Sequence, residues 1–310
     1  MNNPIAWMNG QLLPFEQTSL PVWDLGVVAG ASITEMARTF AHRPFRLEQH
    51  LQRLIRSCSA LGLHLPYENQ QLQDLASRVL EHNTRLIFYR QSDLGIVVFV
   101  TAGTNATYLA SAGDSVSRQG TVAIHTFELP FSMWQSAIQE GLRLRIPSRR
   151  QLPSDSFPVE HKVRNRLHWI LADRDADAAE PGAKALLLNR DGYITETSTA
   201  CFYGVINGVI VTSDRDVLHS MSCQVVQELA RDLDIPFARR PLQLDDIPKF
   251  SEAFVSSTPC CLLPVHQING RQVGESPASA SKVFRALMKS WSEMAGVEIE
   301  HQILNAGPSQ

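Results

Sequence analysis

The sequence predicts an α+β protein of two domains, and three observations support that fold class. The chain has 310 residues, which is enough for about two domains. Segments with the apolar pattern of strands are interspersed with segments of helical spacing. Between Phe127 and Phe157 this pattern loosens and prolines accumulate, which is typical of a connection between domains. We therefore expect a small domain over residues 1–127 and a larger one over residues 128–310.

The N-terminal half predicts a hairpin, two helices and two further strands. Asn9-Gly10 separates two apolar runs and indicates a hairpin, because both turn positions need positive φ. In "RLEQHLQRLIRSCSALGL" the apolar residues recur at helical spacing, which predicts a helix that Gly62 ends, with Arg53 on its flank. A second helix is expected over residues 68–81. The runs "IVVFVTAG" and "TVAIHTF" are typical of strands, the first buried on both faces.

The C-terminal half begins with a segment around Lys162 that we expect to be helical. Four apolar residues would lie on one side of it: Val163, Leu167, Ile170 and Leu171. The runs "KALLLN", "YITE", "ACFYGVI" and "VIVTS" then predict a β-meander, with turns at Asp191-Gly192 and Asn207-Gly208.

The last third of the chain predicts two helices and two strands. A helix is expected in "SMSCQVVQELARDLD", with Ser220 or Ser222 as its N-cap. "EAFVSST" and "LLPVHQING" are typical of strands, and a final helix is expected over residues 278–294.

The composition argues against several classes of function. The chain has 28 basic and 31 acidic residues and a net charge of −3, so neither nucleic acid nor a membrane surface is an expected partner. Its apolar runs are far shorter than the ~20 residues of a membrane helix. The start "MNNPIAWMNG" lacks the layout of a secretory signal, so we expect a cytoplasmic location.

Metal and nucleotide sites are also not expected. The five cysteines form no CxxC pair, and the ten histidines form no HExxH motif, which argues against a metal site. No Walker loop is present, and "GVVAG" lacks the spacing of a dinucleotide fingerprint.

A single lysine, Lys162, stands among arginines in "PVEHKVRNRLHWILADRDADA". Arginine stays charged in proteins, whereas lysine can lose its proton and attack a carbonyl. Lys162 is therefore a candidate nucleophile, although a solvated lysine near a helix start is the alternative if it is taken alone. Arg164 and Arg166 can favour its neutral form, or they can be exposed helix residues.

Three other stretches are candidates for binding an anion or a cationic ring. The helix start in "HSMSC" offers free N–H groups and hydroxyls that suit a phosphate, or it is only a capped helix start. "FVSSTP" ends a strand with Ser256, Ser257 and Thr258, which suits phosphate oxygens or a simple turn. Glu196 in "YITETS" can pair with a protonated pyridine nitrogen, or it is a rim residue.

The order of these features resembles the fold-type-IV pyridoxal phosphate enzymes, the class IV aminotransferases. That family includes branched-chain and D-amino acid aminotransferases and aminodeoxychorismate lyase. The resemblance covers nearly the whole chain, from "WDLGVVAGASITEMARTF" and "FRLEQHLQRLIRSCSALGL" to "EAFVSSTPCCLLPVHQING". It implies a small N-terminal α/β domain, a larger C-terminal domain with a β-barrel-like core, and a homodimer.

The resemblance also implies a role for individual residues. Lys162 would form a Schiff base with pyridoxal 5'-phosphate and carry the proton at the substrate's Cα. Glu196 would pair with the ring nitrogen. The phosphate would be bound by five residues: Arg53, Met221, Ser222, Ser257 and Thr258.

Several positions depart from the family's pattern at the expected substrate pocket. Ala29 and Thr34 stand where many members carry an aromatic residue, which should widen the pocket, and Val97 replaces a strand arginine. Arg38 matches the family and would meet a substrate carboxylate or form a structural ion pair. The usual Asn after the glutamate motif is Cys201, and after the helix cap the usual Gly and Arg are Ser220 and Cys223.

Pro259 is the sharpest departure, because proline has no N–H to donate. In amino acid aminotransferases of the family, the residue at this position donates its N–H to the substrate's α-carboxylate. We therefore expect α-carboxylate binding to be weakened or rebuilt.

The leading interpretation is an aminotransferase that moves an amino group between an amino acid or amine and a 2-oxo acid. The first alternative is a lyase of the aminodeoxychorismate lyase type, which forms 4-aminobenzoate and pyruvate, since "KVRNRL" is similar to that branch. The second is a catalytically silent homologue that acts as a binding module.

Overall fold

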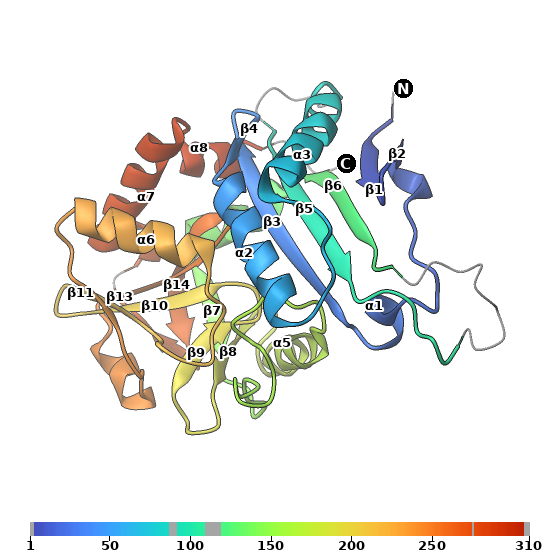
Figure 1. Cartoon of the computed structure of the whole chain (residues 1–310). Coiled ribbons are helices and arrows are strands. Elements are labelled where there is room, and N and C mark those ends of the chain that lie inside the picture. The colour runs from blue at the N-terminus through green and yellow to red at the C-terminus, as the bar shows by residue number, and fades with distance from the viewer. Residues whose placement is uncertain (1–2, 87–91, 109–118, 275, 307–310) are drawn as a thin grey trace. The chain divides into compact units, whose positions relative to one another are not determined.

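The computed structural model describes residues 3–86, 92–108, 119–274 and 276–306 of the chain (Figure 1). The chain divides into two compact units, each built from two segments. The first unit comprises Met1–Leu129 with His161–Asn165, and the second comprises Pro130–Glu160 with Arg166–Gln310. The boundary between independently folding domains at residues 127/128 stays a prediction.

The first unit is built on a six-stranded antiparallel sheet with the order β2-β1-β6-β5-β3-β4 (Figure 1). Its strands are β1 (Ile5–Met8), β2 (Gln11–Pro14), β3 (Ser32–Phe40), β4 (Arg43–Phe45), β5 (Leu94–Thr101) and β6 (Val122–Glu128). The hairpin at Asn9-Gly10 is confirmed, with φ values of 46° and 93° at the two turn residues. Strand β5 lies between β6 and β3 and is largely buried, as its apolar run predicts.

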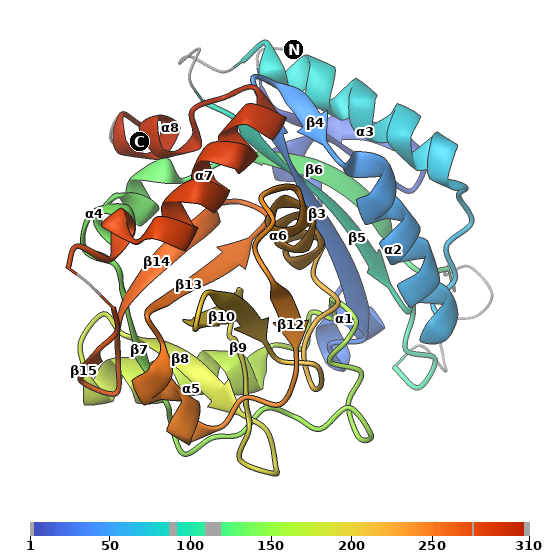
Figure 2. The ribbon, with the colours of Figure 1, turned by 90° about the vertical axis from the view of Figure 1, so that its left-hand side faces the viewer.

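Helices α2 (Leu47–Ala60) and α3 (Asn69–Thr84) pack side by side against this sheet (Figure 2). Leu51 and Leu54 in the apolar stripe of α2 are fully buried, and the chain reverses at Gly62, where φ is +67°. Both predicted helices are therefore confirmed. The first unit also contains the short α1 (Leu25–Val28) and a 3₁₀ turn, η1 (Phe15–Gln17).

The second unit contains a nine-stranded mixed sheet in the order β12-β11-β10-β13-β14-β7-β8-β9, with β15 paired to β14. Its strands are β7 (Leu142–Arg145), β8 (Lys184–Leu188), β9 (Ile194–Thr197), β10 (Cys201–Ile206), β11 (Val209–Thr212), β12 (Phe237–Arg239), β13 (Glu252–Ser257), β14 (Cys261–Ile268) and β15 (Arg271–Gln272). Strands β9 and β10 are in contact although they are not neighbours in this order. The sheet therefore curls into a half-barrel, as the predicted fold class requires.

Five α-helices and three 3₁₀ turns belong to the described part of the second unit. They are η3 (Phe131–Trp134), α4 (Gln135–Glu140), α5 (Leu167–Ala179), α6 (Met221–Asp232), η4 (Leu244–Lys249), η5 (Ala278–Ala280), α7 (Lys282–Ala295) and α8 (Ile299–Leu304). Helices α6 and α7 contact β13, and α5 contacts β8. Among the residues that the structure describes, no helix combines the length and the apolar character needed to cross a bilayer.

The segment around Lys162 is not helical, contrary to expectation, because α5 begins only at Leu167. The predicted apolar side is also wrong: Leu167 and Ile170 are 62% and 50% exposed. The inner face of the helix instead consists of one aromatic and two small residues, which pack against β8: Trp169, Ala172 and Ala176. The alanines allow the helix axis to approach the sheet closely, which bulky aliphatic side chains would prevent.

The predicted β-meander is two separate hairpins, β8–β9 and β10–β11. Strand β10 pairs with β11 and β13 and not with β9. A tight turn explains the break, because the N–H and the Oγ1 of Thr197 both donate to the Ala200 carbonyl at 3.0 Å.

The C-terminal end also differs from the prediction of one helix over residues 278–294. The 3₁₀ turn η5 ends at Ala280, and Ser281 has a ψ of 135°, which interrupts the helical backbone before α7. The short helix α8 was not expected.

Gly204 on β10 faces the ring of Phe250, so the replacement Gly204→Ala tests this contact. An added Cβ would lie 2.3 Å from Phe250 Cε1, and that ring is only 5% exposed. We expect the variant to lose about 1–3 kcal/mol of unfolding free energy in chemical denaturation, because a buried ring must move. The double variant with Phe250→Leu should lose less than the two single variants added together. Additive losses would contradict the contact.

Candidate active site

Lys162 is fixed by its backbone to the beginning of β3. The N–H of Thr34 donates to the Lys162 carbonyl at 3.1 Å, and the N–H of Arg164 donates to the Ser32 carbonyl at 3.0 Å. Residues 162–164 thus run antiparallel to β3 as a short additional strand. The candidate nucleophile belongs to the first unit by virtue of these bonds.

Residues close to Lys162 in the sequence contact other parts of the protein through their side chains. His161 Nδ1 lies 2.9 Å from Ser57 Oγ on α2, within the first unit. Arg164 is exposed, as one of its two expected alternatives states. Arg166 belongs to the second unit, where it donates to the Ser198 carbonyl and lies over the Trp169 ring at 4.3 Å.

Arg53 is buried, with 6% exposure, in an ion pair that the sequence reasoning did not find. Its Nε and Nη2 donate to the two carboxylate oxygens of Glu35 on β3, at 2.6 and 2.8 Å. His50, one helical turn earlier on α2, bonds to Glu35 through Nδ1 at 2.8 Å. The i, i+3 spacing of His50 and Arg53 is the sequence signal that they share one helix face.

The ionisation of Glu35 follows from its two partners. Burial alone would raise the pKa of Glu35, but the Arg53 charge and the hydrogen bonds from His50 and Arg53 outweigh it and lower the pKa from 4.5 to about 2. Burial lowers the pKa of His50 despite the raising effect of Glu35, and the charge of Lys162 adds to the lowering. His50 is therefore a neutral donor to a charged carboxylate at neutral pH.

The expected pocket residues of the first unit have different environments. Thr34 is buried and bonded to Lys162 through its backbone, whereas Ala29 is exposed at the end of α1. Val97 is half-buried on β5. Arg38 is 1% exposed, with Nη2 3.8 Å from Asp93 and its guanidinium 3.9 Å from the centre of the Phe40 ring. That environment favours the structural ion pair among the two alternatives for Arg38.

In the second unit, two of the predicted phosphate-binding stretches meet. Ser220 caps α6 by accepting from the Cys223 N–H at 3.3 Å, which settles the choice of N-cap. Ser222 Oγ lies 2.7 Å from Ser220 Oγ and accepts from Ser256 Oγ of β13 at 3.0 Å. The Tyr203 hydroxyl extends this chain to Ser256 at 2.8 Å. The start of α6 and the end of β13 thus form one cluster of hydroxyls.

Glu196 on β9 is 6% exposed and connects to the same region. Its Oε2 accepts from the Leu218 N–H at 3.2 Å, just before the α6 cap, and its Oε1 accepts from Gln151 Nε2 at 3.0 Å. These two neutral donors therefore satisfy one lone pair on each oxygen of a buried carboxyl group.

The remaining predicted residues lie at the start of α6 and at the end of β13. Met221, 4% exposed, is the first residue of α6. Thr258 and Pro259 form the turn between β13 and β14 together with Cys260, and both are half-buried. Ser257 Oγ lies 3.0 Å from Cys260 Sγ at the base of that turn.

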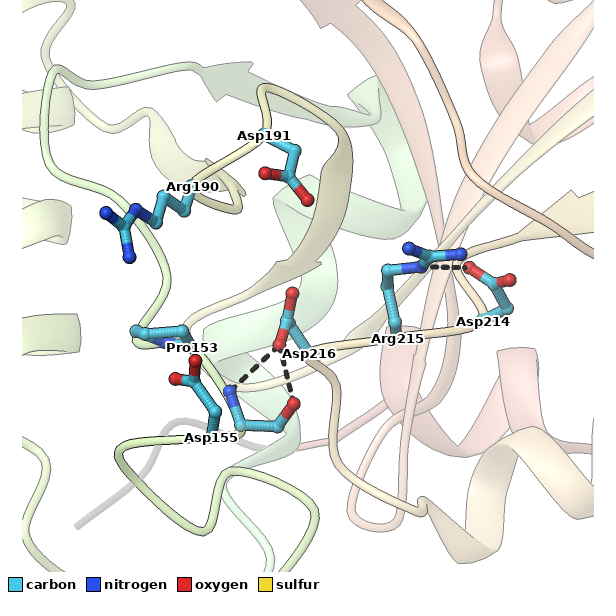
Figure 3. A pocket seen from close by; sticks show the side chains of 8 residues that line it. Pro153, Asp155, Arg190, Asp191, Asp214, Arg215 and Asp216 are labelled. Carbon is cyan, nitrogen blue, oxygen red and sulfur yellow. Dashed lines mark hydrogen bonds and ion pairs between the residues drawn. The ribbon is translucent and has the colours of Figure 1, made fainter.

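A polar hollow of about 660 Å³ lies elsewhere on the second unit (Figure 3). Asp216 at its edge accepts from the N–H and the Oγ of Ser154 at 2.9 Å, and Asp214 pairs with Arg215 (Figure 3). None of the expected site residues lines this hollow. Asp216 does contact Gln151 through its carbonyl at 3.2 Å, so the hollow borders the support of Glu196.

Several residues of the site were missed by the sequence reasoning. Gln151 has no recognisable motif, since it becomes a partner of Glu196 only through the fold. The pairing of Glu35 with Arg53 depends on how α2 packs on β3, which no local pattern indicates. Tyr203 carried no signal beyond a buried strand.

Comparison with known proteins identifies relatives of the chain. The family model for amino-transferase class IV matches residues 32–268. A protein assigned as a branched-chain-amino-acid aminotransferase in Methanocaldococcus jannaschii is 26% identical over 92% of this chain and 96% of its own length. The D-alanine aminotransferase of Listeria monocytogenes is 24% identical over 86% of this chain and 89% of its own length.

Solved structures show the same fold. The T.th. branched-chain amino acid aminotransferase with pyridoxamine 5'-phosphate has a TM-score of 0.78 and 25% identity, over 95% of both chains. The branched-chain aminotransferase of Thermoproteus uzoniensis with norvaline has a TM-score of 0.79 and 24% identity, also over 95% of both chains.

These likenesses confirm the expected two-domain fold-type-IV class. The chain belongs to the class IV aminotransferase family. Its class of activity is therefore amino-group transfer, and neither the lyase nor the silent homologue is favoured by the relatives.

The replacement Glu35→Gln tests the buried ion pair. In the native chain, the stability that Glu35 contributes is present above its unfolded pKa of 4.5 and is lost as the pH falls through about 2. The variant lacks this contribution and should be less stable by about 3 kcal/mol at neutral pH. Its unfolding midpoint in urea should also change less between pH 5 and pH 3.

Glu48→Gln is the control, because Glu48 is an exposed glutamate on α2, the helix that carries Arg53. It should leave both the midpoint and its pH dependence nearly unchanged. Equal behaviour of the two variants would show that the pairing with Arg53 contributes nothing.

Proposed function

We propose that the chain is a pyridoxal phosphate-dependent aminotransferase that uses Lys162 for covalent attachment of the cofactor. It moves an amino group between an amino acid or amine and a 2-oxo acid. The observation that carries this proposal is the chain of contacts from Glu196 through Leu218 and Ser220 to Ser222 and Ser256. It joins a buried carboxylate to a cluster of hydroxyls at a helix start.

The groups present fit a phosphorylated and protonated heterocycle. The first N–H groups of α6 and the hydroxyls of Ser222 and Ser256 are donors of the kind that bind a phosphate at a helix start. Glu196 is a buried carboxylate that can accept a hydrogen bond from a protonated ring nitrogen. Ser257, Thr258 and the Met221 backbone stand at the same two ends of secondary structure.

Lys162 and Arg53 would serve as the nucleophile and as a phosphate-binding guanidinium. Lys162 Nζ would hold the cofactor covalently and would carry the proton from the substrate's Cα. Glu35 orients Arg53 by its two hydrogen bonds, so the planar fork is preorganised for phosphate. Bound pyridoxal phosphate supplies the electrophilic aldehyde and an electron-withdrawing ring.

Thr34 supports Lys162, and Gln151 supports Glu196. The backbone bond from Thr34 limits the positions that Lys162 can take, because its carbonyl is fixed to β3. Gln151 is 1% exposed and holds Glu196 Oε1 in place. Removing either support should change the geometry of the site without removing a reacting group.

The relatives bear on the donor as well. One is named for branched-chain amino acids and one for D-alanine, so the names of the relatives do not agree on one donor. We propose a homodimer in the cytoplasm, in line with the family resemblance. Light scattering of the purified protein checks the first, and a mass of one chain of 34.5 kDa would contradict it.

Replacing Lys162 tests the central assignment. Lys162→Ala should reduce turnover by about 10³-fold or more, because it removes both the nucleophile and the proton carrier. Borohydride treatment of the native holoenzyme should attach the cofactor to the peptide that contains Lys162. Lys184→Ala, an exposed lysine on β8, is the control and should keep full activity. Intact turnover in Lys162→Ala would refute the proposal.

The spectrum of the cofactor separates transamination from elimination. An amino donor without an acceptor should convert the bound cofactor to its amine form in a single turnover. A return to the starting spectrum together with pyruvate release would favour the lyase instead.

Pro259→Ala tests the expected change in carboxylate binding. The alanine restores a backbone N–H at the β13–β14 turn, and a hydrogen bond to a charged group is worth about 1.5–3 kcal/mol. We expect kcat/KM for amino acid donors to rise about tenfold, with no change for amines that lack a carboxylate. An unchanged rate with amino acids would remove the support for a role of Pro259.

A further inference from the structure

Two departures from the family pattern, Cys201 and Cys223, meet in the second unit. Cys201 is the first residue of β10, and Cys223 lies in the first turn of α6. Cys201 Sγ lies 3.5 Å from Thr212 Oγ1 on β11, and Cys223 Sγ accepts from the side chain of Arg239 on β12, the residue paired with Thr212. Both cysteines thus lie beside one position of the β11–β12 pair, and they are 6% and 2% exposed. No local pattern pairs them, since 21 residues, including strand β11, separate their positions.

A cation and a phenol complete the surroundings of the two thiols. Arg239 on β12 donates through Nη2 to Cys223 Sγ at 3.2 Å. Tyr203 follows Cys201 by two residues on β10 and so lies on the same face of that strand. A guanidinium beside one sulfur of a close pair is the arrangement that stabilises a single thiolate next to a neutral thiol.

The ionisation of the pair is consistent with this geometry. The hydrogen bond from Cys201 outweighs burial and, with the charge of Arg239, lowers the pKa of Cys223 to about 7. The hydrogen bond to Cys223 and burial together raise the pKa of Cys201. Burial and the neighbouring sulfurs raise the pKa of Tyr203. One sulfur is thus a nucleophile near neutral pH, and the other keeps its proton.

The other cysteines have different environments. Cys58 is buried in the first unit, where burial and the charge of Glu35 raise its pKa to about 12. Cys260 is bonded to the Ser257 hydroxyl, and Cys261 is fully buried at the start of β14. These three residues serve as internal controls for thiol reactivity.

We propose that Cys201 and Cys223 are a redox modification site, which hydrogen peroxide converts from a dithiol into an intramolecular disulfide. The Cys223 sulfur attacks one peroxide oxygen, the O–O bond breaks, and a sulfenic acid and a hydroxide are formed. The Cys201 sulfur then attacks the Cys223 sulfur and loses its proton, and the sulfenic oxygen leaves as water. Two electrons pass from the two sulfurs to the peroxide, which becomes two waters. The product ties the start of β10 to the first turn of α6.

The test is oxidation of the full-length protein, as purified with its cofactor, by a small excess of hydrogen peroxide. After quenching, unfolding and alkylation, the treated protein should show three alkylated thiols of the five cysteines, with a disulfide that joins the Cys201 and Cys223 peptides. The rate should rise about tenfold between pH 6 and pH 8, because the thiolate fraction increases through the pKa of Cys223 near 7.

Three variants make the result specific. Cys58→Ser should form the disulfide at the native rate, whereas Cys201→Ser and Cys223→Ser should not form it. Cys201→Ala and Cys223→Ala repeat the test in case a serine hydroxyl disturbs the cluster, and circular dichroism confirms the fold of each. Five alkylatable thiols after oxidation, or a disulfide between other cysteines, would overturn the proposal. So would an undiminished disulfide in the Cys201 or Cys223 variants.

Discussion

A buried charge, the Glu35 carboxylate, sets the strongest constraint on the first unit. A carboxylate removed from water must find positive or donating partners, or it takes up a proton. Glu35 finds both on α2, in Arg53 and His50. This requirement fixes the rotation of α2 on β3, and the same strand holds the backbone of Lys162 through Thr34. The backbone of Lys162, the proposed nucleophile, and the guanidinium of Arg53 are thus both held by β3.

The constraint on the second unit is that the many polar groups in its curled sheet need hydrogen-bond partners. Ser222, Ser256 and Tyr203 satisfy one another in a chain of hydroxyls at the start of α6. Glu196 accepts hydrogen bonds from one backbone N–H and one amide side chain. Both donors are neutral groups, and a bound ligand with positive charge beside that carboxylate would be stabilised by it.

Much of the fold could be predicted from local patterns. The Asn9-Gly10 hairpin and α2 followed from turn chemistry and apolar spacing, which depend on few neighbours. The segment at Lys162 could not be read in this way. Its helical spacing is overridden because residues 162–164 add to β3, and α5 buries Trp169 and two alanines in place of its leucines. Local propensity lost to tertiary contacts there.

For the candidate site, the sequence proposes the reacting groups but does not indicate the residues that support them. Lysine, glutamate and the hydroxyl-rich stretches have types and an order that indicate their chemistry. Gln151 and Glu35 act through contacts between elements far apart in the sequence, as do Cys201 and Cys223. Only the three-dimensional arrangement reveals which side chain faces which.

The strand-like pairing of residues 162–164 with β3 has a consequence for anyone who divides this protein. A recombinant fragment that stops at Leu129 would contain every long element of the first unit but not the five residues His161–Asn165. The N–H of Thr34 and the carbonyl of Ser32 would then have lost these hydrogen bonds at the edge of the sheet. An exposed strand edge can pair with other chains. We therefore expect the fragment to self-associate along this edge, and the intact chain not to do so.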